Sequence, residues 1–147
     1  MHIREAVRGD EHDLMAMIKG LAEYEKEPDA VRNTPEELAK HLFDEKICHG
    51  FMLEHEGESI GFAIYYISYS TWNGPCLYLE DLYVKPERRG TGGGALLFDH
   101  LLELAKSRGY ARMDWQILDW NEPAIEFYKR KGATIDTDWY NGRMFFK

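Results

Sequence analysis

Residues 77–107 read LYLEDLYVKPERRGTGGGALLFDHLLELAKS and predict a strand, a basic turn, a glycine-rich loop and an amphipathic helix in succession. The loop, Arg89-Gly90-Thr91-Gly92-Gly93-Gly94, offers backbone N–H groups that no bulky side chain shields. The helix after it adds the unpaired amides of its first turn and the positive end of its dipole. Such an arrangement binds anions, and we expect the anion to be a cofactor phosphate.

Two known phosphate-binding loops can be compared with this one. The Walker motif requires Lys and then Ser or Thr after its last glycine, where this chain has Ala95-Leu96, so that motif is excluded. Gly90, Gly92 and Ala95 do fit the dinucleotide spacing G-x-G-x-x-A. However, that motif directly follows the first strand of a larger sheet, and here residues 85–89 intervene. A dinucleotide-dependent oxidoreductase therefore remains a weaker alternative.

The loop also resembles the signature of the GCN5-related N-acetyltransferases (GNAT), R/Q-x-x-G-x-G/A. Arg89, Gly92 and Gly94 fill its fixed positions after the acidic strand LYLEDLYV. Three further segments resemble the spermidine/spermine (diamine) and thialysine N-acetyltransferase branch, in the same order and at similar spacing. They are LAEYEKE (21–27), YSTWNG (69–74) and LDWNEPAIEFYKRKGA (118–133). The resemblance covers nearly the whole chain and implies a GNAT fold with acetyl-CoA as the co-substrate.

The resemblance also implies which residues hold acetyl-CoA. The glycine loop would bind the pyrophosphate, and main-chain groups that follow Glu80 would pair with the pantetheine arm and the oxyanion. The family usually has Ile or Val at Gly93, so a third consecutive glycine should loosen the helix start, at a cost of about 1 kcal/mol. The expected cofactor-binding residues are Leu82, Tyr83, Val84, Arg89, Gly90, Thr91, Gly92, Gly93, Gly94, Ala95, Asn121, Pro123 and Lys129.

Acetyl transfer to an amine requires a base, because an alkylamine with a pKa near 10.4 is almost wholly protonated at neutral pH. Glu80 is the predicted base, acting directly or through water, and it matches the glutamate with this role in related acetyltransferases. Regular strand alternation would place Asp81 on the opposite face, as a structural or edge-exposed residue, with substrate binding as the alternative. Tyr128 matches the family tyrosine that acts as general acid at the sulfur, and the alternative is a packed aromatic.

Four positions resemble family residues that border the amine acceptor in addition to Glu80. Tyr24 and Glu25 match a pair that contacts polyamines, Trp72 lies in a loop beside the acceptor site, and Asp114 occupies a strand that lines it. An ordinary solvated helix end is the alternative for Glu25, and simple loop packing is the alternative for Trp72. The acceptor stays open among polyamines, diamines, lysine-like amino acids such as thialysine, and other small amines. A non-catalytic acetyl-CoA-binding module would lack Glu80 or Tyr128, and both are present.

Composition is that of one compact acidic domain, 1–147, with 44% apolar residues and a formal net charge of −8. This charge argues against nucleic acid as a partner and suits a cationic small-molecule amine. Lysines and arginines nevertheless gather at 85–89 and 129–131, where an anionic cofactor would need them. The resemblance implies a homodimer.

No metal site is expected, because the six histidines show no ligand spacing. Cys48 and Cys76 fit reduced thiols better than a disulfide. The N-terminus does not resemble a signal peptide, and the longest apolar run, GFAIYYISY, is too short to cross a bilayer. We therefore expect a cytoplasmic protein that does not enter membranes.

Periodicity and turn residues predict a mixed α/β fold, mostly antiparallel, with one splayed parallel strand pair after the glycine-loop helix. Thr34-Pro35-Glu36-Glu37 and Asn121-Glu122-Pro123 predict helix starts. The predicted strands are 2–6, 51–55, 59–70, 76–84, 111–119 and 143–146, and the predicted helices are 10–25, 34–43, the loop helix to 107, and one from 121 that Gly132 ends.

Overall fold

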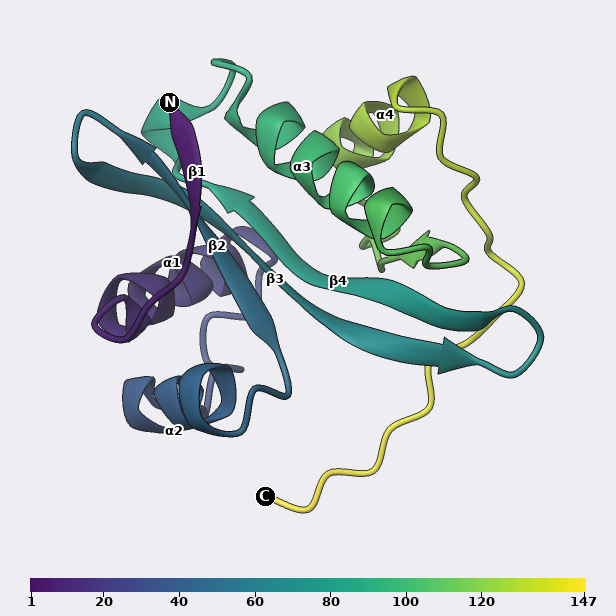
Figure 1. Ribbon diagram of the computed structural model, residues 1–147, viewed down its shortest axis with the longest axis horizontal. Helices are drawn as coiled ribbons and strands as arrows, with labels where there is room; N and C mark the ends of the chain where they lie inside the picture. The colour runs from purple at the N-terminus through teal and green to yellow at the C-terminus, as the bar shows by residue number, and fades with distance from the viewer. The chain divides into compact units, whose positions relative to one another are not determined.

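The computed structural model describes residues 1–147, and the chain divides into two compact units, Met1–Gln116 and Ile117–Lys147. The first unit holds a five-stranded sheet with helices on both of its faces, as the mixed α/β prediction requires (Figure 1). Its elements are β1 (His2–Glu5), α1 (Glu11–Tyr24), α2 (Pro35–Ala39), the π-helical turn η1 (Lys40–Asp44), β2 (His49–His55), β3 (Glu58–Ser70), β4 (Gly74–Val84), the 3-10 turn η2 (Pro86–Arg88), α3 (Gly93–Ser107) and β5 (Met113–Asp114).

The strands follow the order β1-β2-β3-β4-β5, with antiparallel pairing up to β4 and parallel pairing of β4 with β5. The parallel pair is confirmed, but it is much shorter than the predicted strand 111–119. Only Leu77 and Tyr78 of β4 pair with β5, and β4 then continues to Val84 with β3 as its partner on the other side. The strands splay as predicted, and the sheet opens there.

The second unit contains one helix, α4 (Glu122–Arg130), and no strand. The Asn121 side chain caps α4 by accepting a hydrogen bond from the amide of Ala124, as predicted. The predicted strand 143–146 is wrong. A short apolar run becomes a strand only when a neighbouring strand pairs with its backbone, and the second unit has none.

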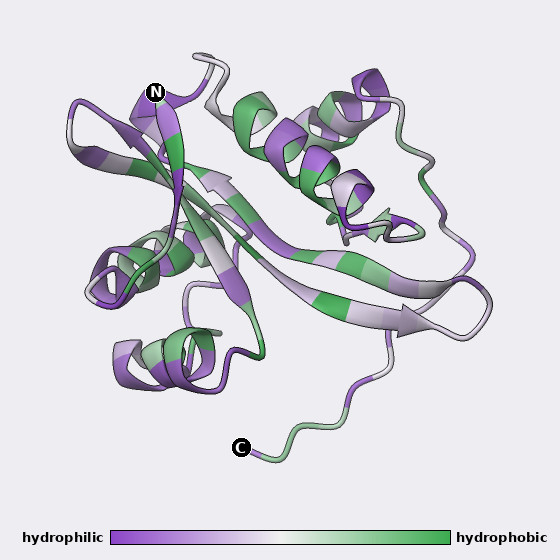
Figure 2. Cartoon of the chain, in the orientation of Figure 1, coloured by the Kyte–Doolittle hydropathy of each residue, from purple (hydrophilic) through white to green (hydrophobic).

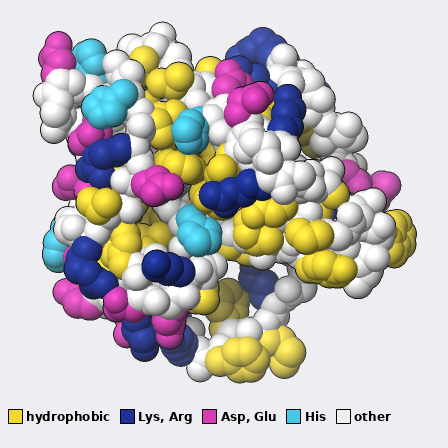
Figure 3. All heavy atoms as spheres, viewed as in Figure 1, with side chains coloured by type: hydrophobic (Ala, Val, Ile, Leu, Met, Phe, Trp, Pro, Cys, Tyr) yellow, Lys and Arg dark blue, Asp and Glu magenta, His cyan; other side chains and the backbone are white.

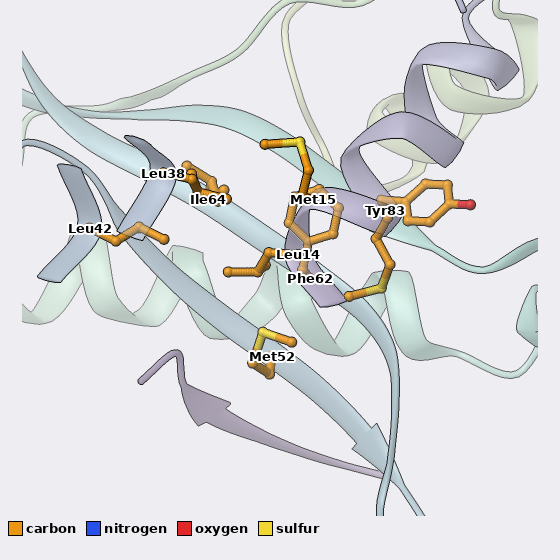
Figure 4. Close-up of a cluster of buried hydrophobic side chains, with 9 residues drawn as sticks. Leu14, Met15, Leu38, Leu42, Met52, Phe62, Ile64 and Tyr83 are labelled. Atoms are coloured by element: carbon orange, nitrogen blue, oxygen red, sulfur yellow. The ribbon is translucent and has the colours of Figure 1, made fainter. Parts of the chain in front are cut away.

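One face of the sheet packs against α1 and α2 through the main apolar cluster of the molecule (Figure 4). Leu14 and Met17 of α1 are buried in this cluster, and Ile18 and Leu21 are partly buried beside them. Thr34 caps α2 by accepting a hydrogen bond from the Glu37 amide. In Figure 2, green apolar residues alternate with purple polar residues along α1 and α3. The cluster comprises Leu14, Met15, Met17, Leu38, Leu42, Met52, Phe62, Ile64 and Tyr83.

The pairing of β3 with β4 changes register at the acidic residues of LYLEDLYV. Ile64 faces Asp81 and Tyr65 faces Leu79, so Glu80 has no partner and forms a β-bulge. Ile64 belongs to the cluster under α1, and the residue directly opposite it must share its face. The extra residue therefore directs Asp81 towards α1 together with Glu80. The expectation that the two carboxylates lie on opposite faces was wrong, because regular alternation fails at a bulge.

Asp81 is partly buried rather than edge-exposed. Its burial, followed by the charges of Glu80 and Glu25, raises the pKa of Asp81 to about 7. The folded state therefore binds a proton more tightly at Asp81 than the unfolded chain does. It follows that rising pH costs stability over the range between the ordinary carboxyl pKa and about 7.

We therefore expect wild-type protein to lose thermal stability between about pH 5 and about pH 8 more steeply than Asp81→Asn, which carries no charge to desolvate. Thermal unfolding followed by circular dichroism at both pH values checks this. Asp29→Asn, in an exposed loop, is the matched control and should follow the wild type. Equal slopes for wild type and Asp81→Asn would show that Asp81 ionises without penalty.

Candidate active site

The glycine loop turns sharply into α3. Gly90 and Gly92 have φ values of 80° and 89°, in the left-handed region where only glycine is unstrained. Leu96 makes the first bond of the helix, to the carbonyl of Gly92 at 3.0 Å. The amides of the three residues before Leu96 thus have no carbonyl partner. Because open space surrounds Gly90, Gly92 and Gly94, an anion can approach this backbone.

Gly93 has a different role from its neighbours. It is the first residue of α3 and is buried, and a Cβ built on it would lie 2.7 Å from Cδ2 of Leu53. Leu53 is itself fully buried. The side chain that the family usually carries here is thus replaced by Leu53, so Gly93 allows α3 to begin directly against β2.

The basic residues before the loop are not all available to an anion. Lys85 and Arg88 both pair with Glu58, at 3.5 and 3.2 Å. Arg89 forms no ion pair, and its Nε donates to the carbonyl of Val84 at 3.0 Å. On the face drawn in Figure 3, basic, acidic and histidine side chains are interspersed with apolar ones. Arg89 is therefore the cation of this segment that is not already neutralised.

A group of carboxylates surrounds the bulge of β4. Glu80 is exposed, and its charge acts on both Asp81 and Glu25, the residue that ends α1. Burial, and then the Glu80 charge, raise the pKa of Glu25. The same two causes raise the pKa values of the Cys48 thiol and the Tyr66 hydroxyl. The bulge thus brings three carboxyl groups from α1 and β4 into mutual repulsion, an arrangement that a bound cation relieves.

Aromatic rings border this acidic group. Tyr66 and Tyr78 face each other in the β3–β4 pairing and stack with their centroids 5.0 Å apart. Tyr78 lies two residues before Glu80 on the same strand. Sequence reasoning missed Tyr66 and Tyr78, and it kept substrate binding by Asp81 only as an alternative. Tyr78 could have been found from its spacing, because residues two apart on a strand share a face and Tyr78 lies two before Glu80. Tyr66 lies beside them only because of the register between β3 and β4.

Two predicted acceptor residues do not join the carboxylate group in the first unit. Trp72 is 90% exposed at the tip of the β3–β4 hairpin. Gly74, next to that tip, is six residues from Glu80, which corresponds to about 20 Å along a strand. Asp114 accepts a hydrogen bond from Nε of Arg112 at 2.8 Å, so its carboxylate already has a cationic partner. The acceptor role of both residues stays a prediction.

The second unit carries the remaining predicted residues on or next to α4. Tyr128 is buried, and its ring meets the edge of Phe127 with centroids 5.1 Å apart. Asn121 is buried at the helix start, Pro123 lies in the first turn, and Lys129 is exposed in the last turn. The side chain of Asn121 caps α4, and its main-chain N–H and carbonyl are bonded to Leu118 and Ile125, at 3.0 Å each, so its cofactor role stays a prediction.

No group of three or more His, Cys, Asp or Glu side chains is arranged to hold a metal ion. None of the helices combines the length and the apolar character that crossing a bilayer demands. Cys48 and Cys76 are free thiols.

Comparison with known proteins assigns the chain to a family. The model of the acetyltransferase (GNAT) family matches residues 14–133. The thialysine N-ε-acetyltransferase of Caenorhabditis elegans is 40% identical over 134 residues, covering 89% of this chain and 83% of the relative. The human spermidine/spermine N(1)-acetyltransferase-like protein 1 is 32% identical over 139 residues, covering 89% of this chain but only 20% of that longer protein.

Solved structures agree on the fold. A mutant of the BH1408 protein from Bacillus halodurans superimposes with a TM-score of 0.82 over 99% of this chain and all of that chain, at 20% identity. Such an identity supports the fold alone. The family match over most of the sequence and the 40% identity to the worm enzyme show that the chain belongs to the acetyltransferase (GNAT) family and is an N-acetyltransferase.

Proposed function

We propose that this enzyme transfers the acetyl group of acetyl-CoA to a primary amine of a small cationic acceptor, a polyamine, a diamine or a lysine-like amino acid such as thialysine. One observation carries the proposal. The bulge of β4 gathers Glu25, Glu80 and Asp81, and the same strand leads through η2 into the amide-rich start of α3. An anion-binding backbone and a cation-binding carboxylate group thus lie at the two ends of one short segment.

GNAT acetyltransferases use acetyl-CoA as co-substrate, and the residues of the first unit fit that group. The unpaired amides of Gly93, Gly94 and Ala95, with Thr91 and the left-handed Gly90 and Gly92, suit its pyrophosphate. No strand pairs with β4 beyond Tyr78 on the β5 side, so the main chain of Leu82, Tyr83 and Val84 can pair with an extended arm. When bound, acetyl-CoA supplies an activated thioester.

The carboxylates first bind the protonated amine and then take its proton. Glu80 is exposed at the bulge and is the proposed base, directly or through one water. Glu25 and the partly protonated Asp81 hold a second positive charge of the acceptor. Binding a cation favours their ionised forms, which folding alone disfavours. An acceptor with two cationic centres would therefore bind this carboxylate group more tightly than an acceptor with a single amine.

Tyr128 is the proposed general acid, whose hydroxyl donates a proton to the leaving thiolate. The family resemblance of NEPAIEFYKRKG and its position on a capped, proline-started helix support this role. The names of the similar proteins from worm and human support the acceptor class. A non-catalytic module is the second candidate, and turnover measurements distinguish the two. We further propose that the enzyme is cytoplasmic, because both thiols are free.

Acetylation assays with a panel of amines test this proposal and its two catalytic roles. Wild type should release CoA with thialysine, spermidine or a diamine. Tyr128→Phe should lower kcat by about 10²–10⁴-fold with little change in acetyl-CoA affinity. Glu80→Gln should lower kcat by a smaller factor, about tenfold to a hundredfold, because water partly replaces the base. It should also flatten the alkaline rise in rate and weaken amine binding. Full turnover by Tyr128→Phe with a slow acceptor would make Tyr128 a packing residue, and acetyl-CoA binding with no acceptor turned over would favour the module.

Two alanine substitutions distinguish the roles of Gly92 and Gly94 in the loop. Gly92→Ala should weaken acetyl-CoA binding and lower the melting temperature, because a φ of 89° strains any side chain by about 1–2 kcal/mol. Gly94→Ala is the matched control: its Cβ meets open space, its φ is not positive, and the signature itself allows Ala there. It should keep the affinity and stabilise α3 by up to about 1 kcal/mol. Calorimetric titration with acetyl-CoA checks both, and equal affinity in the two variants would refute the loop assignment.

We also propose that the enzyme is a homodimer, in agreement with its exposed aromatics. Tyr69 and Trp72 on the β3–β4 hairpin are 73% and 90% exposed. Such residues are enriched at interfaces, where burying their rings removes large apolar areas from water. Light scattering at tens of micromolar should therefore give about twice the chain mass of 17.2 kDa. A single-chain mass at that concentration would contradict the proposal.

A further inference from the structure

Arg89, the first residue of the R-x-x-G-x-G motif, is turned back onto the body of the first unit. Its Nε donates to the carbonyl of Val84, and its guanidinium lies over the ring of Tyr24 at 4.6 Å and near the ring of Tyr83 at 5.6 Å. A flat cation above an aromatic face is an attractive contact. Arg89 therefore joins the start of the glycine loop to the last turn of α1, although 65 positions separate Arg89 from Tyr24.

Tyr83 supplies a rigid base for this contact. It belongs to the apolar cluster beneath α1, where its ring lies 6.0 Å from that of Phe62. A Cβ built on Gly20 would lie 2.6 Å from the Tyr83 hydroxyl oxygen, so α1 and β4 approach each other closely at this point. Tyr24 follows Gly20 by four residues, one helical turn further along the same side of α1. The guanidinium thus lies beside one buried ring, that of Tyr83, and one exposed ring, that of Tyr24.

Tyr24 connects this contact to the carboxylate group proposed to bind the acceptor. Glu25 follows Tyr24 directly and ends α1, and its carboxyl is influenced by Glu80. Lys26 then adopts a left-handed φ of 64°, and the chain leaves the helix. A contact that keeps Tyr24 in the helical turn also restrains the backbone of Glu25, since the two residues are adjacent at the end of α1.

We propose that Arg89 is a positioning residue that couples the cofactor loop to the acceptor end of α1. Occupation of the loop fixes Arg89 in the contact that it already makes with the ring of Tyr24, and Tyr24 holds Glu25 beside Glu80. Because coupling between sites is reciprocal, the amine and the cofactor each bind more tightly in the presence of the other. The inference rests on the proposed function for the identity of the acceptor. Its first link, from the glycine loop through Arg89 to Tyr24, does not depend on that identity.

Amide hydrogen exchange of the last turn of α1 tests that link with CoA alone. The amides of Glu25 and Glu27 donate to Leu21 and Ala22, at 2.9 and 2.8 Å, so their exchange requires this turn to open. Saturating CoA should slow exchange of both amides in wild type by about fivefold, the effect expected of a modest coupling. Tyr24→Phe keeps the ring and should retain the slowing. Tyr24→Leu and Arg89→Lys, which lose the ring and the flat cation respectively, should abolish it.

Arg88→Gln is the matched control, because the adjacent cation pairs with Glu58 and should leave the slowing intact. Unchanged exchange in wild type, or full slowing in Tyr24→Leu, would overturn the coupling. A second readout is the affinity for thialysine, measured with and without CoA, which should improve in wild type and Tyr24→Phe but not in Tyr24→Leu. If CoA slows exchange but thialysine does not bind, the proposed acceptor fails while the coupling stands.

Discussion

Glu80 is an extra residue in β4, and the chemistry of the first unit depends on it. Because Glu80 has no partner in β3, Asp81 is brought opposite Ile64 and so onto the face that α1 covers. Without the bulge, one of the two carboxylates would point away from α1. With it, Glu25, Glu80 and Asp81 repel one another in a partly desolvated place, and a cation is the natural partner.

The same strand, β4, also provides the unpaired edge at which the cofactor is proposed to bind. β5 leaves β4 after Tyr78, so the last residues of β4 keep one edge unpaired just before the chain enters η2 and the glycine loop. Bulges bend and twist a strand, and both effects help two neighbouring strands to separate. The opening of the sheet and the gathering of carboxylates thus arise within one stretch of β4, from Leu79 to Val84.

Packing explains two features of the loop that its motif alone does not. Gly93 is small because Leu53 of β2 occupies the volume that a side chain would need. Arg89 does not extend freely from the loop, because Val84 accepts its Nε and two tyrosines lie beside its guanidinium. Lys85 and Arg88 are held by Glu58. The anion site therefore relies more on main-chain amides than the cluster of basic residues suggests.

The sequence by itself determined the features that depend on neighbours a few residues apart. These are the caps at Thr34 and Asn121 and the glycine loop with the helix after it. It also determined the family, whose motifs are read residue by residue. Only the tertiary structure decided the place of Asp81, the partner of Arg89, the reason for Gly93 and the two-residue length of β5. Each of these depends on the register between strands, or on desolvation by an element distant in sequence, and no local pattern encodes either.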